Sequence, residues 1–183
     1  IAEAEPDLIE VNISCPNVAS EFGTPFSASA ESAAAVTRTV RKAVNLPISI
    51  KLAPNVPEIS RIAQAVVAEG ADAITAINTM PAMLIDAIAA KPVLSNRTGG
   101  LSGPALKPIA LRCVYELAQA VSVPIIGTGG VSSGIDAAEM LIAGATLVGI
   151  GSAVIKDGPS VFARICTELT TFMSVNGYAQ LAD

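Results

Sequence analysis

Short apolar runs alternate with longer amphipathic stretches along the whole chain. Five runs rich in Val, Ile, Leu and Ala, each ending in polar or Gly residues, predict β-strands at 8–13, 48–52, 73–78, 124–127 and 147–151. Apolar residues at helical spacing predict helices over 30–44, 57–69, 105–121, 134–143 and 159–175. Apolar strands separated by amphipathic helices are typical of a parallel sheet covered by helices. The pattern therefore predicts an α/β fold in a single domain spanning residues 1–183.

Two α/β architectures fit this alternation, a doubly wound sheet and a (β/α)8 barrel. A doubly wound sheet carries its nucleotide loop after the first strand, whereas the glycine-rich stretches of this chain fall late. A closed barrel takes about 250 residues, so five strands in 183 residues cannot complete one. The sequence also begins with Ile1 rather than Met. We therefore expect a piece of a (β/α)8 TIM barrel that supplies about the last five βα units.

The composition argues against several classes of function. The sequence has no His, so a Ser-His-Asp triad, a Cys-His pair and an imidazole metal site are excluded. A net charge of −5 and the lack of any Lys/Arg run argue against a nucleic-acid partner. No apolar run approaches the ~20 residues of a membrane span, and the three cysteines have no zinc-binding spacing. We expect a cytoplasmic protein with no metal site and no membrane segment.

Polar residues at the strand ends are the candidates for chemistry, because active sites of parallel α/β folds lie there. Cys15 follows the first strand within the segment 12–17, and its loop position between two Asn residues favours a reachable thiol. Cys113 and Cys166 fall on predicted helices and are expected to be buried as small apolar side chains. The cysteine that we expect to take part in chemistry is therefore Cys15.

Lys51 ends the second predicted strand inside an apolar run. Its ammonium either is buried beside an anionic or hydrogen-bonding partner or extends to solvent, and the local pattern leaves both open. Asn78 and Thr79 follow the third strand, and their side chains can both donate and accept hydrogen bonds. These residues are suited to binding a small polar substrate.

Three glycine-rich stretches lie at 97–103, 127–130 and 149–152. Glycine lets backbone N–H groups approach a phosphate closely, and a helix that begins behind it favours negative charge. Any one stretch alone could be a simple turn, and none has the Rossmann or P-loop spacing. The last two each end a strand, and together they predict a phosphate cradle. With Cys15 and Lys51, this set suits proton abstraction coupled to an electron-accepting phosphorylated cofactor.

Together these motifs resemble the dihydroorotate dehydrogenases, in particular the catalytic subunit of the NAD-linked class 1B. The matching stretches follow the family's order over nearly the whole chain, at 12–18, 51–55, 77–79, 96–104, 127–130 and 151–152. The stretch Asn-Arg-Thr-Gly-Gly-Leu-Ser-Gly-Pro is the part that favours class 1B over class 1A. The resemblance implies an FMN-binding barrel that oxidises dihydroorotate to orotate in de novo pyrimidine (UMP) biosynthesis.

The resemblance also implies roles for individual residues. Cys15 would be the catalytic base that removes a proton from C5 of dihydroorotate while hydride leaves C6 for the flavin, and Lys51 would stabilise the anionic reduced flavin ring. The implied substrate-binding residues are Asn12, Asn78 and Thr79, with Asn17 as a further contact. The implied cofactor-binding residues are Asn12, Lys51, Ile77, Gly103, Gly129, Gly130, Gly151 and Ser152.

The resemblance finally implies partners and a missing part. The family's first three βα units, which add flavin and substrate contacts, are absent from this chain. The family subunit dimerises and pairs with an iron–sulfur/FAD subunit that passes electrons to NAD. Three other interpretations stay open: a related flavin barrel acting on another dihydropyrimidine, a flavin-free phosphate-binding isomerase or lyase that uses Lys51, and a catalytically silent fragment.

Overall fold

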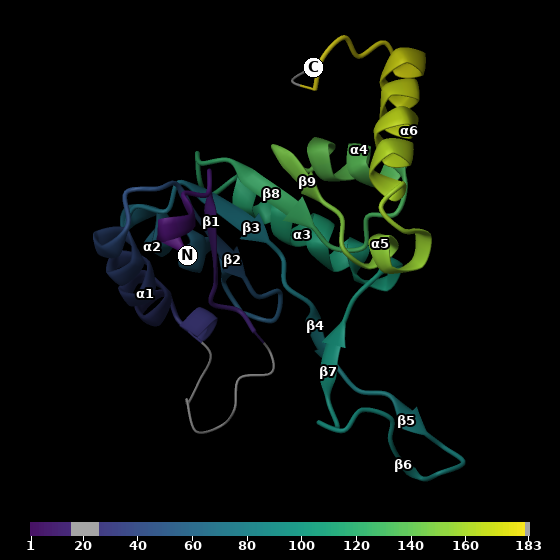
Figure 1. The fold of residues 1–183 in the computed structure, drawn as a ribbon, viewed down its shortest axis with the longest axis horizontal. Coiled ribbons are helices and arrows are strands. Elements are labelled where there is room, and N and C mark those ends of the chain that lie inside the picture. Colours follow the sequence, from purple (N-terminus) through teal and green to yellow (C-terminus); the bar gives the residue numbers. More distant parts are fainter. Residues whose placement is uncertain (16–25, 182–183) are drawn as a thin grey trace.

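The centre of the computed structural model is a five-stranded parallel sheet (Figure 1). The structure describes residues 1–15 and 26–181. The strands lie in the order β1 (Ile9–Asn12), β2 (Ile48–Leu52), β3 (Ala73–Ala76), β8 (Ile125–Thr128) and β9 (Leu147–Gly149). All five predicted strands form, and their ends differ from the predicted ends by at most two residues.

Helices follow the strands as the apolar periodicity predicts. They are α1 (Ala30–Ala43), α2 (Ile59–Ala68), α3 (Lys107–Ala118), α4 (Gly134–Ile142) and α6 (Val161–Asn176). The short helix α5 (Ser152–Asp157) was not predicted. Serine side chains cap two helices: Ser29 Oγ accepts from Ser32 N at 3.1 Å, and Ser133 Oγ accepts from Asp136 N at 3.2 Å. No helix in the described ranges is long and apolar enough to cross a membrane.

The strand order distinguishes the two candidate architectures. The five strands are neighbours in the same order as they occur in the chain, with no reversal. Because parallel crossovers are right-handed, a sheet without reversal carries all its connecting helices on one face. The helices accordingly pack in one row, with α1 on α2, α2 on α3, α3 on α4 and α4 on α6. This is the wall of a barrel rather than a doubly wound sheet, which confirms the expected fold class.

The two faces of the sheet differ in chemistry. Alternate residues of β2 belong to the buried hydrophobic core: Ile48, Ile50 and Leu52. The opposite face carries Ser49 and Lys51, which pair in register with Glu10 and Asn12 of β1. Ser49 Oγ lies 2.8 Å from Thr75 Oγ1 of β3 on this face. On β1 and β2 the face away from the core is therefore polar, and it ends in Asn12 and Lys51 at the carboxyl edge.

Residues 80–101 leave the sheet and form two small antiparallel ladders. In one, β4 (Met80–Ala82) pairs with β7 (Gly99–Leu101), and in the other β5 (Ile85–Asp86) pairs with β6 (Lys91–Pro92). Figure 1 shows this segment projecting away from the sheet. The sequence pattern did not predict these strands, because each has only two or three residues and two contain Pro.

Candidate active site at the carboxyl ends of the strands

A hollow lies where the parallel strands end. It is lined by Lys51 of β2, by residues 77–79 after β3, by residues 128–130 at the end of β8, and by residues 151–152 after β9. Nine of the residues that the sequence singled out meet there: Lys51, Ile77, Asn78, Thr79, Gly103, Gly129, Gly130, Gly151 and Ser152. Two further lining residues, Ser102 and Thr128, lie within the glycine-rich stretches that the sequence analysis named but were given no role there. Leu106 is a lining residue that the sequence analysis missed. Segments far apart in sequence thus converge on one site.

The glycines leave room in this hollow for a ligand to approach the backbone. Gly103 and Gly130 have φ values of +80° and +77°, a region that side chains disfavour. A Cβ at Gly130 would lie 2.7 Å from Gly103 O, so no side chain fits there. A Cβ at Gly151 would meet no atom within 4 Å in the described part of the chain. Accessible backbone beside glycines that have no room for a Cβ is compatible with the phosphate cradle, which stays a prediction.

An ion pair holds the loop that carries Gly129 and Gly130. Ser132 N and Ser132 Oγ both donate to Asp136 Oδ2 at 2.9 Å, and Lys107 Nζ lies 2.5 Å from Asp136 Oδ1. Burial on its own would raise the pKa of Asp136, but the hydrogen bonds from Lys107 and Ser132 lower the pKa to about 2. The same bond to Asp136 raises the pKa of Lys107. Both groups are therefore ionised at neutral pH, and they clamp the loop.

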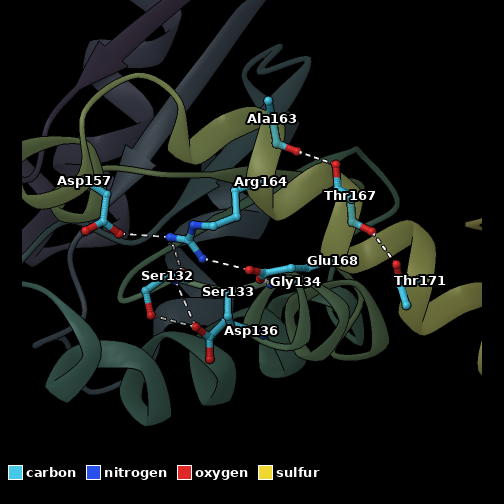
Figure 2. Close-up of polar contacts among 10 residues, drawn as sticks. All are labelled: Ser132, Ser133, Gly134, Asp136, Asp157, Ala163, Arg164, Thr167, Glu168 and Thr171. Carbon is cyan, nitrogen blue, oxygen red and sulfur yellow. Dashed lines mark hydrogen bonds and ion pairs between the residues drawn. The ribbon is translucent and has the colours of Figure 1, made fainter.

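Arg164 of α6 holds the same loop from another direction. Figure 2 shows its guanidinium between Asp157 and Glu168. Arg164 Nη2 donates to Ser132 O at 3.2 Å and to Asp157 Oδ2 at 2.9 Å, and Nη1 donates to Glu168 Oε1 at 2.9 Å. Glu168 Oε2 also accepts from Gly134 N at 2.6 Å, and this bond, together with Arg164, lowers the pKa of Glu168. The beginning of α4 and the end of α5 are thus both fixed to α6.

The predicted substrate-binding residues form a hydrogen-bond network around Ser14. Asn12 Oδ1 accepts from Ser14 N at 3.1 Å and from Ser14 Oγ at 3.0 Å. Asn78 Nδ2 donates to Asn12 Oδ1 at 3.3 Å, to Ser14 O at 3.2 Å and to Ser14 Oγ at 3.0 Å. Asn78 Oδ1 accepts from Thr79 N at 2.7 Å. Asn12 therefore does not line the hollow itself but is bonded to Asn78, which does.

Thr79 is held closely by the ladder that projects from the sheet. A Cβ at Gly100 would overlap the Thr79 side chain, so only glycine fits at this position of β7. Gly99 and Gly100, which the sequence placed in a stretch suited to phosphate, therefore lie in a strand that packs against a substrate-binding candidate. Within that stretch, Ser102 and Gly103 are the residues that reach the hollow.

Cys15 lies beside the asparagine network, in a second hollow. This second hollow is lined by Ser14, Cys15, Ser27, Ala28, Ala53, Asn55, Val56 and Pro57. The thiol is free and half-buried. Ser14 connects the two hollows, because it lines the second one and its partner Asn78 lines the first. The other predicted contact from this segment, Asn17, lies outside the described residues.

The two remaining cysteines behave differently from each other. Cys113 of α3 is fully buried, as expected, and burial raises the pKa of its thiol. The expectation that Cys166 is buried is wrong, because it is exposed on α6. In α6, the side that packs against the core presents Val161 and Ile165 as its buried residues. Cys166 lies on the other side of the helix.

Lys51 falls between the two expected alternatives. Its side chain is 25% exposed, and Nζ lies 3.2 Å from Glu10 Oε1 on the neighbouring strand. Ion pairs with this much solvent access stabilise a fold by only about 0–1 kcal/mol. The ammonium can therefore exchange Glu10 for a stronger anionic partner in the hollow at little energetic expense.

Comparison with known proteins connects this geometry to one family. A family profile described as Dihydroorotate dehydrogenase matches residues 2–173. The chain belongs to the dihydroorotate dehydrogenase family. One curated relative, Dihydroorotate dehydrogenase B (NAD(+)), catalytic subunit, from Methanothermobacter thermautotrophicus, is 45% identical over 180 residues. Another, Dihydroorotate dehydrogenase A (fumarate) from Lacticaseibacillus paracasei, is 57% identical over 145 residues. The resemblance seen in the motifs is thus confirmed at the level of the family.

The matches also show how much of these proteins the chain represents. The B-type match covers 98% of this chain and 59% of that relative, and the A-type match covers 79% and 50%. The crystal structure of DHODH from Eimeria tenella in complex with ferulenol has a TM-score of 0.80 and 23% identity. That match covers 96% of this chain and 52% of the Eimeria chain. The chain therefore spans between half and three-fifths of the dihydroorotate dehydrogenases that it matches.

Proposed function

We propose that the full-length protein oxidises dihydroorotate to orotate in de novo pyrimidine (UMP) biosynthesis, with FMN as its cofactor. The observation that carries this proposal is the hollow at the carboxyl ends of the strands. It joins a lysine, an Asn-Thr pair and two glycine-rich turns in one place, and it does so in a member of the dihydroorotate dehydrogenase family. These are the parts needed to bind a phosphorylated flavin beside a small polar substrate.

The proposed cofactor site uses the backbone of the glycine turns and one cation. The phosphate end of FMN would be held by the backbone of residues that line the hollow: Gly103, Gly129, Gly130, Gly151 and Ser152. Lys51 would leave Glu10 and place its ammonium beside the flavin ring. Ile77 and Asn12 would complete the contacts to the ring. FMN, when bound, supplies the acceptor for the hydride that leaves C6 of the substrate.

The proposed proton transfer uses Cys15. Oxidation of dihydroorotate removes a proton from C5 and a hydride from C6, and a thiolate is a suitable base for the proton. Cys15 is free, half-buried and adjacent to Ser14, which bonds both asparagines. Asn12, Asn78 and Thr79 would bind the ring carbonyls and the carboxylate, with Asn17 as a further contact, so that C5 faces the Cys15 thiol.

Replacement of Cys15 tests this assignment in the full-length protein. We expect Cys15→Ala to retain bound flavin but to slow flavin reduction by dihydroorotate about 10²–10⁴-fold, the usual contribution of a general base. Cys166→Ala is the matched control, because Cys166 is also a free thiol but lies exposed on α6. Anaerobic stopped-flow absorbance measures both rates. Equal rates in the two variants would remove Cys15 from the mechanism.

A related flavin enzyme acting on another dihydropyrimidine is the second candidate, because asparagine amides recognise any ring that carries carbonyl groups. Dihydrouracil lacks the carboxylate of dihydroorotate, so turnover of the two compounds separates the candidates. We expect reduction of the flavin by dihydroorotate and not by dihydrouracil. The opposite preference would transfer the proposal to the second candidate.

We further propose the NAD-linked B type, acting in the cytoplasm as a homodimer with an FAD/iron–sulfur electron-transfer subunit. The B-type match covers more of the chain than the A-type match, and the name of the B-type relative calls it a catalytic subunit. Co-expression of the full-length protein with an FAD/iron–sulfur electron-transfer subunit from the same organism tests this. We expect a stable complex that reduces NAD. Fumarate reduction by the catalytic chain alone would instead indicate the A type.

A further inference from the structure

Ser14 occupies an unusual position between two asparagines of the candidate site. Its residue surface is only 3% exposed. Its hydroxyl lies 3.0 Å from Asn12 Oδ1 and 3.0 Å from Asn78 Nδ2. A hydroxyl has one proton, so Ser14 Oγ donates to Asn12 and accepts from Asn78. The side chain thus bridges the end of β1 to the segment that follows β3.

The backbone atoms of Ser14 identify which way both amides point. Ser14 N can only donate, and it lies 3.1 Å from the Asn12 side chain, so the atom that faces it must be Oδ1. Ser14 O can only accept, and it lies 3.2 Å from the Asn78 side chain, so the atom that faces it must be Nδ2. Both amide orientations therefore follow from hydrogen-bond chemistry. The hydroxyl fits only this combination, because it needs an acceptor on one side and a donor on the other.

These orientations determine what the site offers to a ligand. Asn12 Oδ1 already accepts three hydrogen bonds, whereas Asn12 Nδ2 donates none within residues 1–15 and 26–181. Asn78 Nδ2 is turned to Ser14 and Asn12, and Asn78 Oδ1 accepts from Thr79 N. The free group of the network is therefore the donor pair on exposed Asn12. This pattern selects a ligand that presents carbonyl or carboxylate oxygens.

We propose that Ser14 is a positioning residue that sets the amide orientations of Asn12 and Asn78 and thereby selects a substrate with oxygen acceptors. This inference rests on the proposed function, because it assumes that the Asn12 amide, held by Ser14 and Asn78, contacts the substrate. Ser14 acts through the asparagines and does not itself take part in proton transfer. Its loss consequently weakens substrate binding equally in the ground state and the transition state, and so raises KM with little change in kcat.

Ser14→Ala in the full-length, flavin-loaded enzyme tests the inference. The variant loses the two hydroxyl bonds and keeps the two backbone bonds. We expect the Kd for orotate, measured by flavin absorbance, and the KM for dihydroorotate to rise about tenfold, as loss of one to two net hydrogen bonds predicts. Flavin content and kcat should change less than about twofold. Ser49→Ala is the matched control, because Ser49 is a fully buried serine whose hydroxyl bonds to Thr75 on the same sheet. It should change none of these quantities.

A double-mutant cycle shows whether Ser14 acts through its asparagine neighbour. The second substitution is therefore Asn12→Ala, because Asn12 carries the free donor pair of the network. If Ser14 acts through Asn12, adding Ser14→Ala to Asn12→Ala raises the orotate Kd by much less than tenfold, because the amide that Ser14 orients is already absent. A full tenfold effect in both backgrounds, or a Ser14→Ala enzyme indistinguishable from Ser49→Ala, would overturn the inference while leaving the proposed function intact. A wild-type flavin that neither binds orotate nor is reduced by dihydroorotate would refute the proposed function itself.

Discussion

Asp136→Asn is the substitution whose effect follows most directly from the structure. Asp136 is mostly buried and accepts hydrogen bonds from Ser132 N, Ser132 Oγ and Lys107 Nζ. Asparagine has nearly the same shape but lacks the charge, as a protonated aspartic acid does. The substitution therefore removes the ionic part of the clamp on the loop that carries Gly129 and Gly130.

The lowered pKa of Asp136 gives the size of the effect. The pKa falls from 3.8 to about 2 on folding, and each pKa unit corresponds to about 1.4 kcal/mol. The charged form therefore stabilises the fold by about 2.5 kcal/mol at pH 7. Because the folded pKa is the lower one, this contribution is complete well above pH 3.8, declines as the pH falls below that value, and is lost as the pH falls through 2. At pH 3 about 1.3 kcal/mol is expected to remain.

Urea unfolding of the full-length protein and its Asp136→Asn variant at pH 7 and pH 3 measures this contribution. The deficit of the variant should be about 2.5 kcal/mol at pH 7 and about half of that at pH 3. Asp7→Asn, which replaces an exposed carboxylate, is the control and should change the free energy of unfolding by less than about 0.5 kcal/mol. A deficit that stays the same at both pH values would refute the assignment of this stability to the ionised carboxylate.

Two further predictions concern the cradle and the thiols. Gly130→Ala should lower FMN affinity in a flavin titration, because its Cβ would lie 2.7 Å from Gly103 O. Gly158→Ala is the control, because Gly158 has a similar φ of +72° and its Cβ would meet no atom within 4 Å in the described part of the chain. This variant should carry the same backbone strain and leave FMN affinity unchanged. Equal FMN affinities in the two variants would contradict the cradle. In thiol labelling, exposed Cys166 should react at once and buried Cys113 only on unfolding, and fast labelling of Cys113 in the folded protein would contradict its burial.

The regular part of the fold was predictable from sequence because burial determines it. The strands of the sheet are apolar runs, and the helices carry apolar residues at three- and four-residue spacing. Each pattern therefore indicated one type of secondary structure. The projecting segment 80–101 was missed for the opposite reason. Its strands bury little and depend on local contacts, such as the close approach of Gly100 to Thr79, which no periodicity reveals.

The candidate site was predictable as a set of residues but not as an arrangement. Positions at the carboxyl ends of parallel strands identified Lys51, Asn78 and the glycine turns, because the fold class alone places such ends together. The partner of Lys51 was not predictable, because Glu10 pairs with it only through the register of two strands. Ser14 was overlooked for a similar reason. The sequence does not show that Asn78, 64 residues away in the chain, lies within hydrogen-bond distance of Ser14.

The visible spectrum of the anaerobic full-length protein, recorded before and after addition of dihydroorotate, tests the central claim most directly. The account predicts a bound flavin whose absorbance band bleaches with dihydroorotate and stays unchanged with dihydrouracil. A protein that carries no flavin, or a flavin band that dihydroorotate leaves unbleached, would contradict it.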